Sequence, residues 1–475
     1  MIANLKPYPA MKDSGVEWLG EVPEHWDVVK LRHVLRPVVE RDRPDLPLLS
    51  VVREKGVIVR DVSSRDENRN YIPEDLSNYK VARAGQLAMN KMKAWQGSYG
   101  ISRQDGLVSP AYFVFAVTGV EAEFFHRAIR SKAYVPFFAQ ASDGVRIGQW
   151  DLSQARMREI AFSVPPLPEQ GAIVRFIEYV DRRLRRYIRA KRKLIKLLKE
   201  QKQAIIHRAV TRGLDPEVPL KDSGVEWLGQ VPEHWEAATL RRVILSAIDG
   251  PHHSPSYTDD GIPFLSARNV KADRWSLDDA KFISEADYLE FSRRVIPEPG
   301  DVLYTKGGTT GIARAVDLDF RFQVWVHIAV LKVVRSKITP EFLAMALNSP
   351  RCYEQSQLLT RGATNQDLGL NRMKGIYLAL PPIPEQATIA TYLDSATAEI
   401  DTAITRANRE IELLKEYRTR LIADVVTGKL DVREVAASLP DESDDLEEEG
   451  ELDELMPDET GVAIDDEDSK ANGDE

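Results

Sequence analysis

Cysteine is almost absent from this chain. The single cysteine among its 475 residues, Cys352, excludes an internal disulfide and a metal cluster built on cysteines. Long apolar runs are missing as well. No segment approaches the roughly eighteen consecutive apolar residues of a membrane span, and the first residues do not resemble a secretory signal. The composition therefore predicts a cytoplasmic protein with no membrane association.

Catalytic motifs are lacking too. The Pro-Pro pairs, in VPPL and LPPI, do not follow the Asn or Asp that a methyltransferase would need. The glycine cluster from Lys306 to Gly311 has the wrong order for a nucleotide-binding P-loop. No cysteine or helical partner spacing accompanies the doublet His252-His253, as a zinc site would require. The sequence thus predicts neither catalytic residues nor a metal site, and a chain that binds rather than reacts.

Negative charge is concentrated at the carboxyl end. From Pro440 onward, 18 acidic residues stand against one lysine, a net charge of −17. Because the whole chain carries −10, the part before Pro440 carries +7. Dense like charge with few aromatic residues is typical of a disordered, solvated tail. The mildly basic remainder permits binding to nucleic acid without requiring it.

Two repeats divide the chain into halves. The motif KDSGVEWLGEVPEHW at 12–26 returns at 221–235 with one change, and PPLPEQ at 165–170 returns as PPIPEQ at 381–386. Each half therefore has a short repeated motif, a body that differs between the halves, and a long helix. Because the motif is nearly identical in both halves, we expect it to support the fold rather than to read sequence. We expect its tryptophans to dock into the scaffold: Trp18, Trp26, Trp227 and Trp235.

Apolar residues in the two long helical patterns recur at spacings of four and three. Sustained spacing of this kind indicates coiled-coil pairing. Lys191 and Gln201 interrupt the first pattern. The predicted seam of the first helix is Ile173, Ile177, Val180, Leu184, Tyr187, Leu194, Leu198 and Ile205. That of the second is Ile389, Leu393, Ala396, Ile400, Ala403, Leu414, Tyr417 and Leu421.

The two helices differ in charge. The first carries a net +11 between residues 171 and 213, whereas the second carries a net −1 between residues 387 and 429. The basic surplus near Arg182 to Lys196 fits a solvated helix face as well as a surface for DNA phosphate or an acidic partner.

The two bodies mix strand-like runs, such as AYFVFAV and VWVHIAVLKV, with short helical segments such as EFLAMALNS. We therefore expect an α/β fold with two domains in pseudo-symmetric tandem, joined by two long antiparallel coiled-coil helices. Unlike bodies on a repeated frame suggest a common scaffold that presents two different reading surfaces.

Each body has two glycine-containing loops rich in amide, hydroxyl and basic side chains, the groups that contact base edges. The loops stand at similar positions in both halves, after Gly85 and Gly300 and again before each Pro-Pro pair. The candidate DNA-binding residues of the first body are Lys91, Lys93, Gln96, Ser98, Tyr99, Arg146 and Gln149. Those of the second are Lys306, Thr309, Thr310, Arg361, Thr364, Asn365 and Gln366. His252 and His253 fit an ordinary surface loop as well as a DNA contact, and Trp95 and Trp150 fit packing anchors.

From about Lys12 to Asp431, the paired motifs SGVEWLG-x-VPEHW and PP-[LI]-PEQ before a long helix resemble the specificity subunit of Type I restriction-modification systems. The resemblance implies two target recognition domains, each reading one half of a bipartite site in double-stranded DNA. It implies that the long helices set the spacer between the two half-sites and dock two modification subunits. It also implies that restriction subunits join the complex. S-adenosylmethionine, ATP and magnesium are then expected on these partner subunits and no cofactor on this chain.

The resemblance gives a division into seven segments. They are an N-terminal segment 1–26, a first recognition domain 27–164, a central long helix 165–214, a repeated segment 215–235, a second recognition domain 236–380, a C-terminal long helix 381–431 and an acidic tail 432–475. The family pattern does not require the tail. The alternative function is a coiled-coil scaffold that binds other proteins and no DNA.

Overall fold

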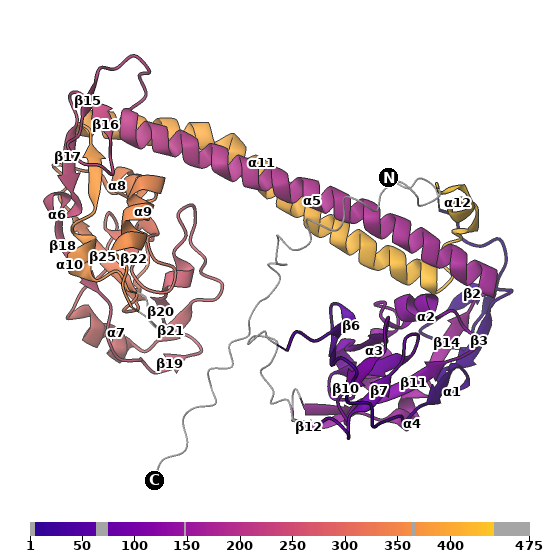
Figure 1. Ribbon diagram of the computed structural model, residues 1–475. Coiled ribbons are helices and arrows are strands. Elements are labelled where there is room, and N and C mark those ends of the chain that lie inside the picture. The colour runs from indigo at the N-terminus through magenta and orange to yellow at the C-terminus, as the bar shows by residue number, and fades with distance from the viewer. Residues whose placement is uncertain (1–4, 63–74, 147–148, 363–366, 441–475) are drawn as a thin grey trace, which may run out of the picture. The chain divides into compact units, whose positions relative to one another are not determined.

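The computed structural model describes residues 5–62, 75–146, 149–362 and 367–440, which form two compact units (Figure 1). The first unit comprises Met1–Tyr187 and Leu413–Glu475, and the second comprises Ile188–Glu412. The boundary between the units falls inside both long helices, so each unit contains one body and a part of each helix. Among the described helices, none combines the length and the apolar character needed to cross a membrane.

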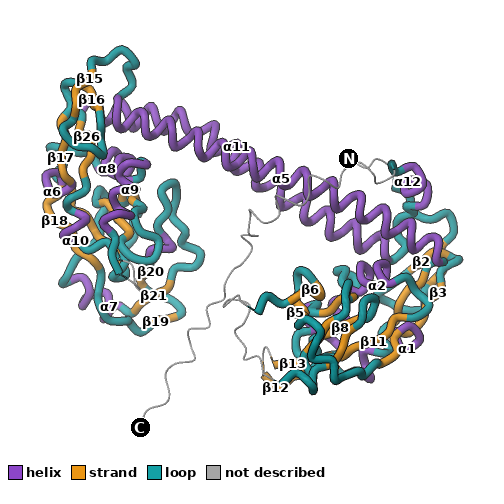
Figure 2. The backbone as a smooth tube through the Cα atoms, viewed as in Figure 1, coloured by secondary structure: helices purple, strands orange, loops and turns teal. Residues whose placement is uncertain are grey.

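A four-stranded antiparallel sheet forms the centre of the first body (Figure 2). On its strand β11, Phe115 packs into the main core while Val114 packs against Leu49 and Val51 on the opposite face. Successive residues of a strand point to opposite faces, so burial of both faces explains why the run AYFVFAV is continuously apolar. The strand order is β4 (Leu35–Pro37), β11 (Phe113–Val117), β8 (Leu87–Met89) and β9 (Tyr99–Ile101).

The other described strands of the first unit pair two by two, all antiparallel. The pairs are β1 (Met11–Asp13) with β2 (Glu21–Pro23), β3 (Asp27–Lys30) with β14 (Ala161–Val164), β5 (Leu49–Val52) with β6 (Gly56–Val59), β7 (Lys80–Ala82) with β10 (Gly106–Val108), and β12 (Ser142–Arg146) with β13 (Gln149–Leu152). The short helices are α1 (Leu31–Val34), η1 (Ala94–Gln96), α2 (Ala122–Ile129), α3 (Val135–Gln140), α4 (Gln154–Met157) and α12 (Arg433–Ser438). The predicted start of the disordered tail at residue 432 is wrong, because Val432 and Ala436 are buried in the first core.

The second body is built on a sheet of the same order. It consists of β18 (Ile244–Asp249), β25 (Ile328–Val333), β22 (Val302–Thr305) and β23 (Ala313–Ala315), again antiparallel. The predicted strand in VWVHIAVLKV is β25, and the predicted helix in EFLAMALNS is α8 (Pro340–Leu347). Thr339 begins α8 by accepting the Phe342 backbone N–H, because the first turn of a helix has no internal acceptor for its N–H groups.

A second sheet distinguishes this body from the first. Its order is β19 (Tyr257–Thr258), β21 (Lys281–Ile283), β20 (Ile262–Leu265) and β24 (Gln323–Val324), with β20 and β24 parallel. The remaining short helices of the second unit are α6 (Leu240–Val243), η2 (Ala267–Asn269), α7 (Glu285–Ser292), α9 (Pro350–Leu359) and α10 (Leu370–Met373).

The repeated motifs fold in the same way in both units. β15 (Leu220–Asp222) and β16 (Gln230–Pro232) form the counterpart of the β1–β2 hairpin. β17 (Glu236–Thr239) pairs with β26 (Tyr377–Leu380), just as β3 pairs with β14. Two like frames therefore carry two unlike bodies.

The long helices are α5 (Leu167–Arg212) and α11 (Ile383–Val426). In the second unit they run antiparallel, since Lys191 Nζ lies 2.6 Å from a Glu410 oxygen and Lys202 Nζ lies 2.6 Å from an Asp401 oxygen. In the first unit, the buried Asp181 accepts hydrogen bonds of 2.7 and 2.8 Å from Arg418. Lys191, which interrupts the apolar pattern, thus lies at the helix contact and is paired there with a carboxylate.

The predicted seam is only partly right. It is wrong at Tyr187 and Leu194, which are 49% and 43% exposed, and at Tyr417, which is 43% exposed. Packing continues instead through Ile188 and Ile195, which join Ile404, Ala407 and Ile411 in one cluster. An α-helix has 3.6 residues per turn, so a seam drifts by one position against a strict seven-residue repeat. The buried members of the predicted seams are Ile173, Ile177, Val180, Leu184, Ile389, Leu393, Ile400 and Leu421.

Candidate nucleic-acid interface

The two predicted loops of the first body lie together. Lys91 Nζ is 2.9 Å from an Asp151 carboxylate oxygen, and the Leu152 backbone N–H donates to the Lys91 carbonyl at 3.0 Å. The rings of Trp95 and Trp150 face each other with centroids 5.3 Å apart. The loop around η1 therefore packs on the β12–β13 hairpin, with the two tryptophans as packing anchors. Two stretches that are distant in sequence thus form one edge of the body.

Tyr99 and Ser98, which are predicted DNA contacts, are not accessible to DNA in this structure. Tyr99 is fully buried in β9, its hydroxyl donates to the Ile129 carbonyl at 3.0 Å, and burial raises its pKa. Ser98 is 2% exposed. The chain returns into the central sheet directly after Gly97, and side chains there face the core rather than a groove of DNA.

For the other candidate residues of the first body, a DNA contact stays a prediction. Lys93 is exposed, while Lys91 and Gln96 are half-buried. Arg146 and Gln149 are register partners across the β12–β13 hairpin, but their side chains lie outside the part of the chain that the structure describes.

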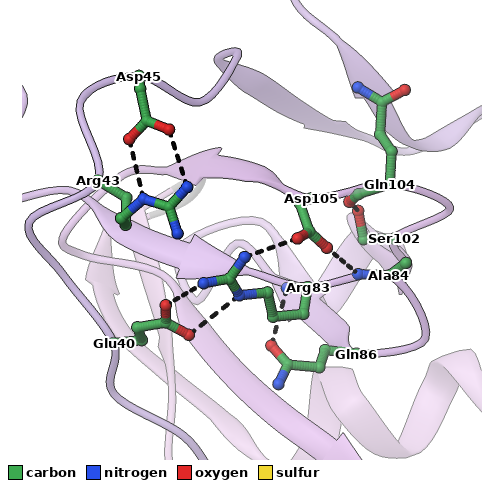
Figure 3. A network of polar contacts seen from close by, with 9 residues as sticks. All are labelled: Glu40, Arg43, Asp45, Arg83, Ala84, Gln86, Ser102, Gln104 and Asp105. Carbon is green, nitrogen blue, oxygen red and sulfur yellow. Dashed lines mark hydrogen bonds and ion pairs between the residues drawn. The ribbon is translucent and has the colours of Figure 1, made fainter.

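A charged network holds the turn that leads into β8 (Figure 3). Arg83 forms ion pairs with Glu40 and, at 2.6 Å, with Asp105. Asp105 also accepts the Ala84 backbone N–H at 2.9 Å, and the Gln86 side chain accepts the Arg83 backbone N–H at 2.9 Å. Hydrogen bonding to Arg83 lowers the pKa of Glu40. Because these charges are partly exposed, the network adds little stability, and its main effect is to fix the course of the chain before the loop at Lys91.

Three loops of the second body meet at Lys306. Its Nζ lies 2.7 Å from an Asp367 oxygen and 3.4 Å from an Asp249 oxygen, and the residue is 6% exposed. Asp249, at the end of β18, is also ion-paired with Arg294. Burial alone would raise the pKa of Asp249, but the Arg294 hydrogen bond and the Lys306 charge outweigh it and lower the pKa. The ammonium group of Lys306 therefore lies buried between carboxylates, where it anchors the loops and is not accessible to DNA in this structure.

Arg361 and Asp367, at the two ends of the described chain around the predicted loop RGATNQ, lie beside the loop TKGGTTG. Arg361 and Asp367 exchange backbone hydrogen bonds of 3.1 and 2.9 Å, and the Leu368 N–H donates to the Lys306 carbonyl at 2.7 Å. Arg361 and Thr309 are exposed, whereas Thr310 is 6% exposed. The side chain of Thr310 is therefore not accessible to DNA in this structure. Three further predicted residues lie outside the described residues: Thr364, Asn365 and Gln366.

His252 and His253 lie on the same side of the second body as this loop cluster. Their side chains are 64% and 61% exposed, and His252 Nε2 is 3.5 Å from the Asp249 carboxylate. The Arg294 guanidinium is 3.4 Å from His252 and 44% exposed, so it adds a cation that sequence reasoning missed. No local pattern marks Arg294, because its partner Asp249 is 45 residues away in sequence.

The repeated motif is anchored to the start of each long helix. The fully buried Trp26 donates its indole N–H to Glu169 at 2.9 Å, and His25 lies 2.7 Å from the same carboxylate. In the second copy, Trp235 donates to Glu385 at 3.0 Å. The predicted docking of these tryptophans is confirmed. Trp18 stacks on Phe137 with centroids 4.0 Å apart, and Trp227 is half-buried.

A duplicated frame with a cluster of polar loops on each body defines a tandem two-domain binding protein. Comparison with known proteins shows which family this chain resembles. Residues 251–413 match the family model of the Type I restriction modification DNA specificity domain. A Methanocaldococcus jannaschii protein, provisionally named the type I restriction enzyme MjaX specificity subunit, is 20% identical over 87% of this chain and 96% of its own length. The Escherichia coli type I restriction enzyme EcoBI specificity subunit is 25% identical over 58% of this chain and 63% of its own length.

A solved structure agrees in fold. A chain from a structural study of a type I R-M system superimposes with a TM-score of 0.59 and 18% identity, over 86% of this chain and 99% of that chain. The predicted resemblance is confirmed: the chain is similar over most of its length to specificity subunits of Type I restriction-modification systems.

Proposed function

We propose that the chain reads a bipartite sequence in double-stranded DNA, one half with each body. The observation that supports this most directly is the equivalent placement of two loop clusters. In the first body the loop after β8 packs on β12–β13, and in the second the loop after β22 packs on Asp367 and Leu368. Like frames with unlike loop chemistry suit two half-sites that differ in sequence.

Methylome sequencing of the host tests this function. We expect a bipartite methylated motif that disappears when the gene is deleted and returns when it is restored. A methylome that is unchanged by the deletion would contradict the proposal.

The division of labour between the bodies is tested with Arg361, which is exposed in the second loop cluster. Arg361→Ala should weaken recognition of one half-site by about 1–3 kcal/mol if the side chain contacts a base. Arg241→Ala removes another exposed arginine, on α6, and serves as the control. Equal weakening of Arg361→Ala on target and random DNA would contradict a role in base reading.

We further propose that this chain contributes no catalytic group and docks two modification subunits through its helices, with restriction subunits joining the complex. S-adenosylmethionine, ATP and magnesium then bind to those partners. The purified full chain should transfer no methyl group from S-adenosylmethionine to target DNA until modification subunits are added. Methyl transfer by the chain alone would overturn this assignment.

The helices also set the spacer between the half-sites in this proposal. Four helix-forming residues inserted after both Glu200 and Thr402 would leave the ion pairs Lys191–Glu410 and Lys202–Asp401 intact on either side. The insertion adds roughly 6 Å of helix, or at most about two base pairs of spacer at about 3.4 Å each. The same insertion in α5 alone is the control for lost pairing. An active variant with an unchanged spacer would refute this role.

The alternative of a coiled-coil scaffold without DNA binding is not favoured. The matched DNA specificity domain covers most of the second body rather than the helices alone.

A further inference from the structure

The β5–β6 hairpin belongs to the first body alone among the described residues. Its register pairs Leu49 with Val59 and Val52 with Gly56, which leaves residues 53–55 as a three-residue loop. Gly56 follows with φ of +77°, the left-handed conformation that closes hairpin loops of this length. The frame common to both bodies cannot distinguish two half-sites, so elements found in one body only are the candidates for contacts of its own.

A half-buried arginine clamps this loop to the predicted DNA-binding loop. Arg130, at the end of α2, donates from Nη2 to the carbonyls of Arg53 and Glu54 at 2.7 and 3.0 Å. From Nη1 it donates to the carbonyls of Gly97 and Tyr99 at 3.2 and 2.5 Å. One guanidinium therefore spans four backbone carbonyls from two segments that are more than forty positions apart in sequence. Burial lowers the pKa of Arg130, so this arrangement is maintained against a desolvation cost.

Close backbone packing fixes the same junction. A Cβ atom at Gly100 would lie 3.0 Å from His126 Cε1 and 3.2 Å from the Gly56 Cα. The His126 Nδ1 in turn accepts the Ile101 backbone N–H at 3.0 Å. The loop at residues 53–55 is therefore held rigidly beside the loop that carries Lys93.

The side chains of this fixed loop extend into solvent and are mainly cationic. Arg53 is 66% exposed and Lys55 is exposed, while the intervening Glu54 is 72% exposed and 3.8 Å from Arg53. The exposed Arg103 lies close enough to contribute to the lowered pKa of His126. A rigid loop with exposed cations beside a predicted recognition loop is suited to DNA phosphate, because phosphate contacts fix the register of a reading surface.

We propose that the β5–β6 loop is a phosphate-contacting element of the first body, with Arg53 and Lys55 as the contacts and Arg130 as the residue that positions them. The inference rests on the proposed function, because it assumes that the first body binds DNA. It assigns these residues to affinity and register, not to the choice of bases.

The test compares the full chain with the double variant Arg53→Ala/Lys55→Ala on a random-sequence duplex at several salt concentrations. The slope of the logarithm of the binding constant against the logarithm of the salt concentration is negative. Each lost phosphate contact reduces its magnitude by about 0.9, so the double variant should have a slope smaller in magnitude by roughly 1.8. The affinity ratio of wild type to variant should then shrink about twelvefold between 50 and 200 mM salt. Lys221→Ala, at an exposed position of the repeated hairpin, is the control that should leave the slope nearly unchanged.

Parallel salt lines for wild type and double variant would overturn the proposal. So would a variant that keeps its salt slope and alters only the bases chosen in one half-site. If wild-type chain prefers no sequence, the proposed function fails, but the salt slope on random DNA still decides the role of the loop.

The positioning role of Arg130 has a separate readout. Arg130→Ala alone should lower the salt slope, and adding it to the double variant should lower the slope no further, because the contacts it positions are already absent. A further loss in the triple variant would show that Arg130 acts on DNA binding by some route other than this loop. Native hydrogen exchange of residues 220–235 in the second unit checks that the rest of the fold is intact.

Discussion

The two copies of the repeated motif provide a matched test of what anchors the frame. Glu169 is 5% exposed and accepts hydrogen bonds from Tyr8, His25 and Trp26. Its counterpart in the second unit, Glu385, is 30% exposed. Among the described residues, it accepts hydrogen bonds from His234 and Trp235 only. We predict that Glu169→Ala destabilises the first motif more than Glu385→Ala destabilises the second.

The magnitude follows from the donors left without an acceptor. In the first copy, the buried Tyr8 hydroxyl and Trp26 indole lose their partner, at about 1–3 kcal/mol each, or about 2–6 kcal/mol together. In the second copy only the Trp235 indole is buried, which costs about 1–3 kcal/mol. His25 and His234 are 40% and 48% exposed and can bond to water instead. The difference of about 1–3 kcal/mol corresponds to a change of roughly 5- to 150-fold in the opening constant.

Native hydrogen exchange of the two hairpins measures this difference in one protein, because it reports local opening free energies. Residues 11–26 and 220–235 are compared in the wild type and in each variant. Loss of the acidic residue at the helix start is common to both variants and cancels in the comparison. Equal losses in the two hairpins, or a larger loss in the second, would refute the reasoning from buried donors.

Other predictions concern single sites. Asp249→Ala should cost the second body about 3–5 kcal/mol by equilibrium unfolding, because it breaks a buried charge cluster, and a loss below about 1 kcal/mol would contradict the burial argument. Burial lowers the pKa of His126 from 6.5 to about 3, so the unfolded state binds more protons than the folded state between these pH values. The free energy of unfolding should therefore fall as the pH drops through this range, by up to about 1.4 kcal/mol per pH unit. Exchange of the Ile101 amide, corrected for its intrinsic rate, measures this effect, and a constant opening free energy from pH 6.5 to 5 would speak against it. Ile195→Ala should lower the free energy of unfolding by about 2 kcal/mol, whereas Leu194→Ala should change it by less than about 0.5 kcal/mol. Thermal unfolding measures both, and a larger loss for Leu194→Ala would support the seam predicted from sequence.

The sequence by itself determined the duplicated frame, the two long helices and the positions of the polar loops predicted to contact DNA. These features depend on local patterns: a motif written twice, proline and glutamate at a helix start, and apolar residues at a helical period. The resemblance to Type I specificity subunits followed from the same motifs. Even where the seam was wrong, at Tyr187 and Leu194, the error was a shift of one residue along a correctly predicted helix.

Only the tertiary structure decided which loop residues are accessible. Tyr99 and Lys306 have the side-chain chemistry of a DNA contact, but one is buried in the central sheet and the other lies between the carboxylates of Asp249 and Asp367. Arg130 and Arg294 carry no local signal, because the groups they hold come from distant parts of the chain. Whether a polar side chain faces solvent or anchors a loop depends on long-range packing and on the cost of leaving a buried charge unpaired, and neither can be read from the spacing of residues along the chain.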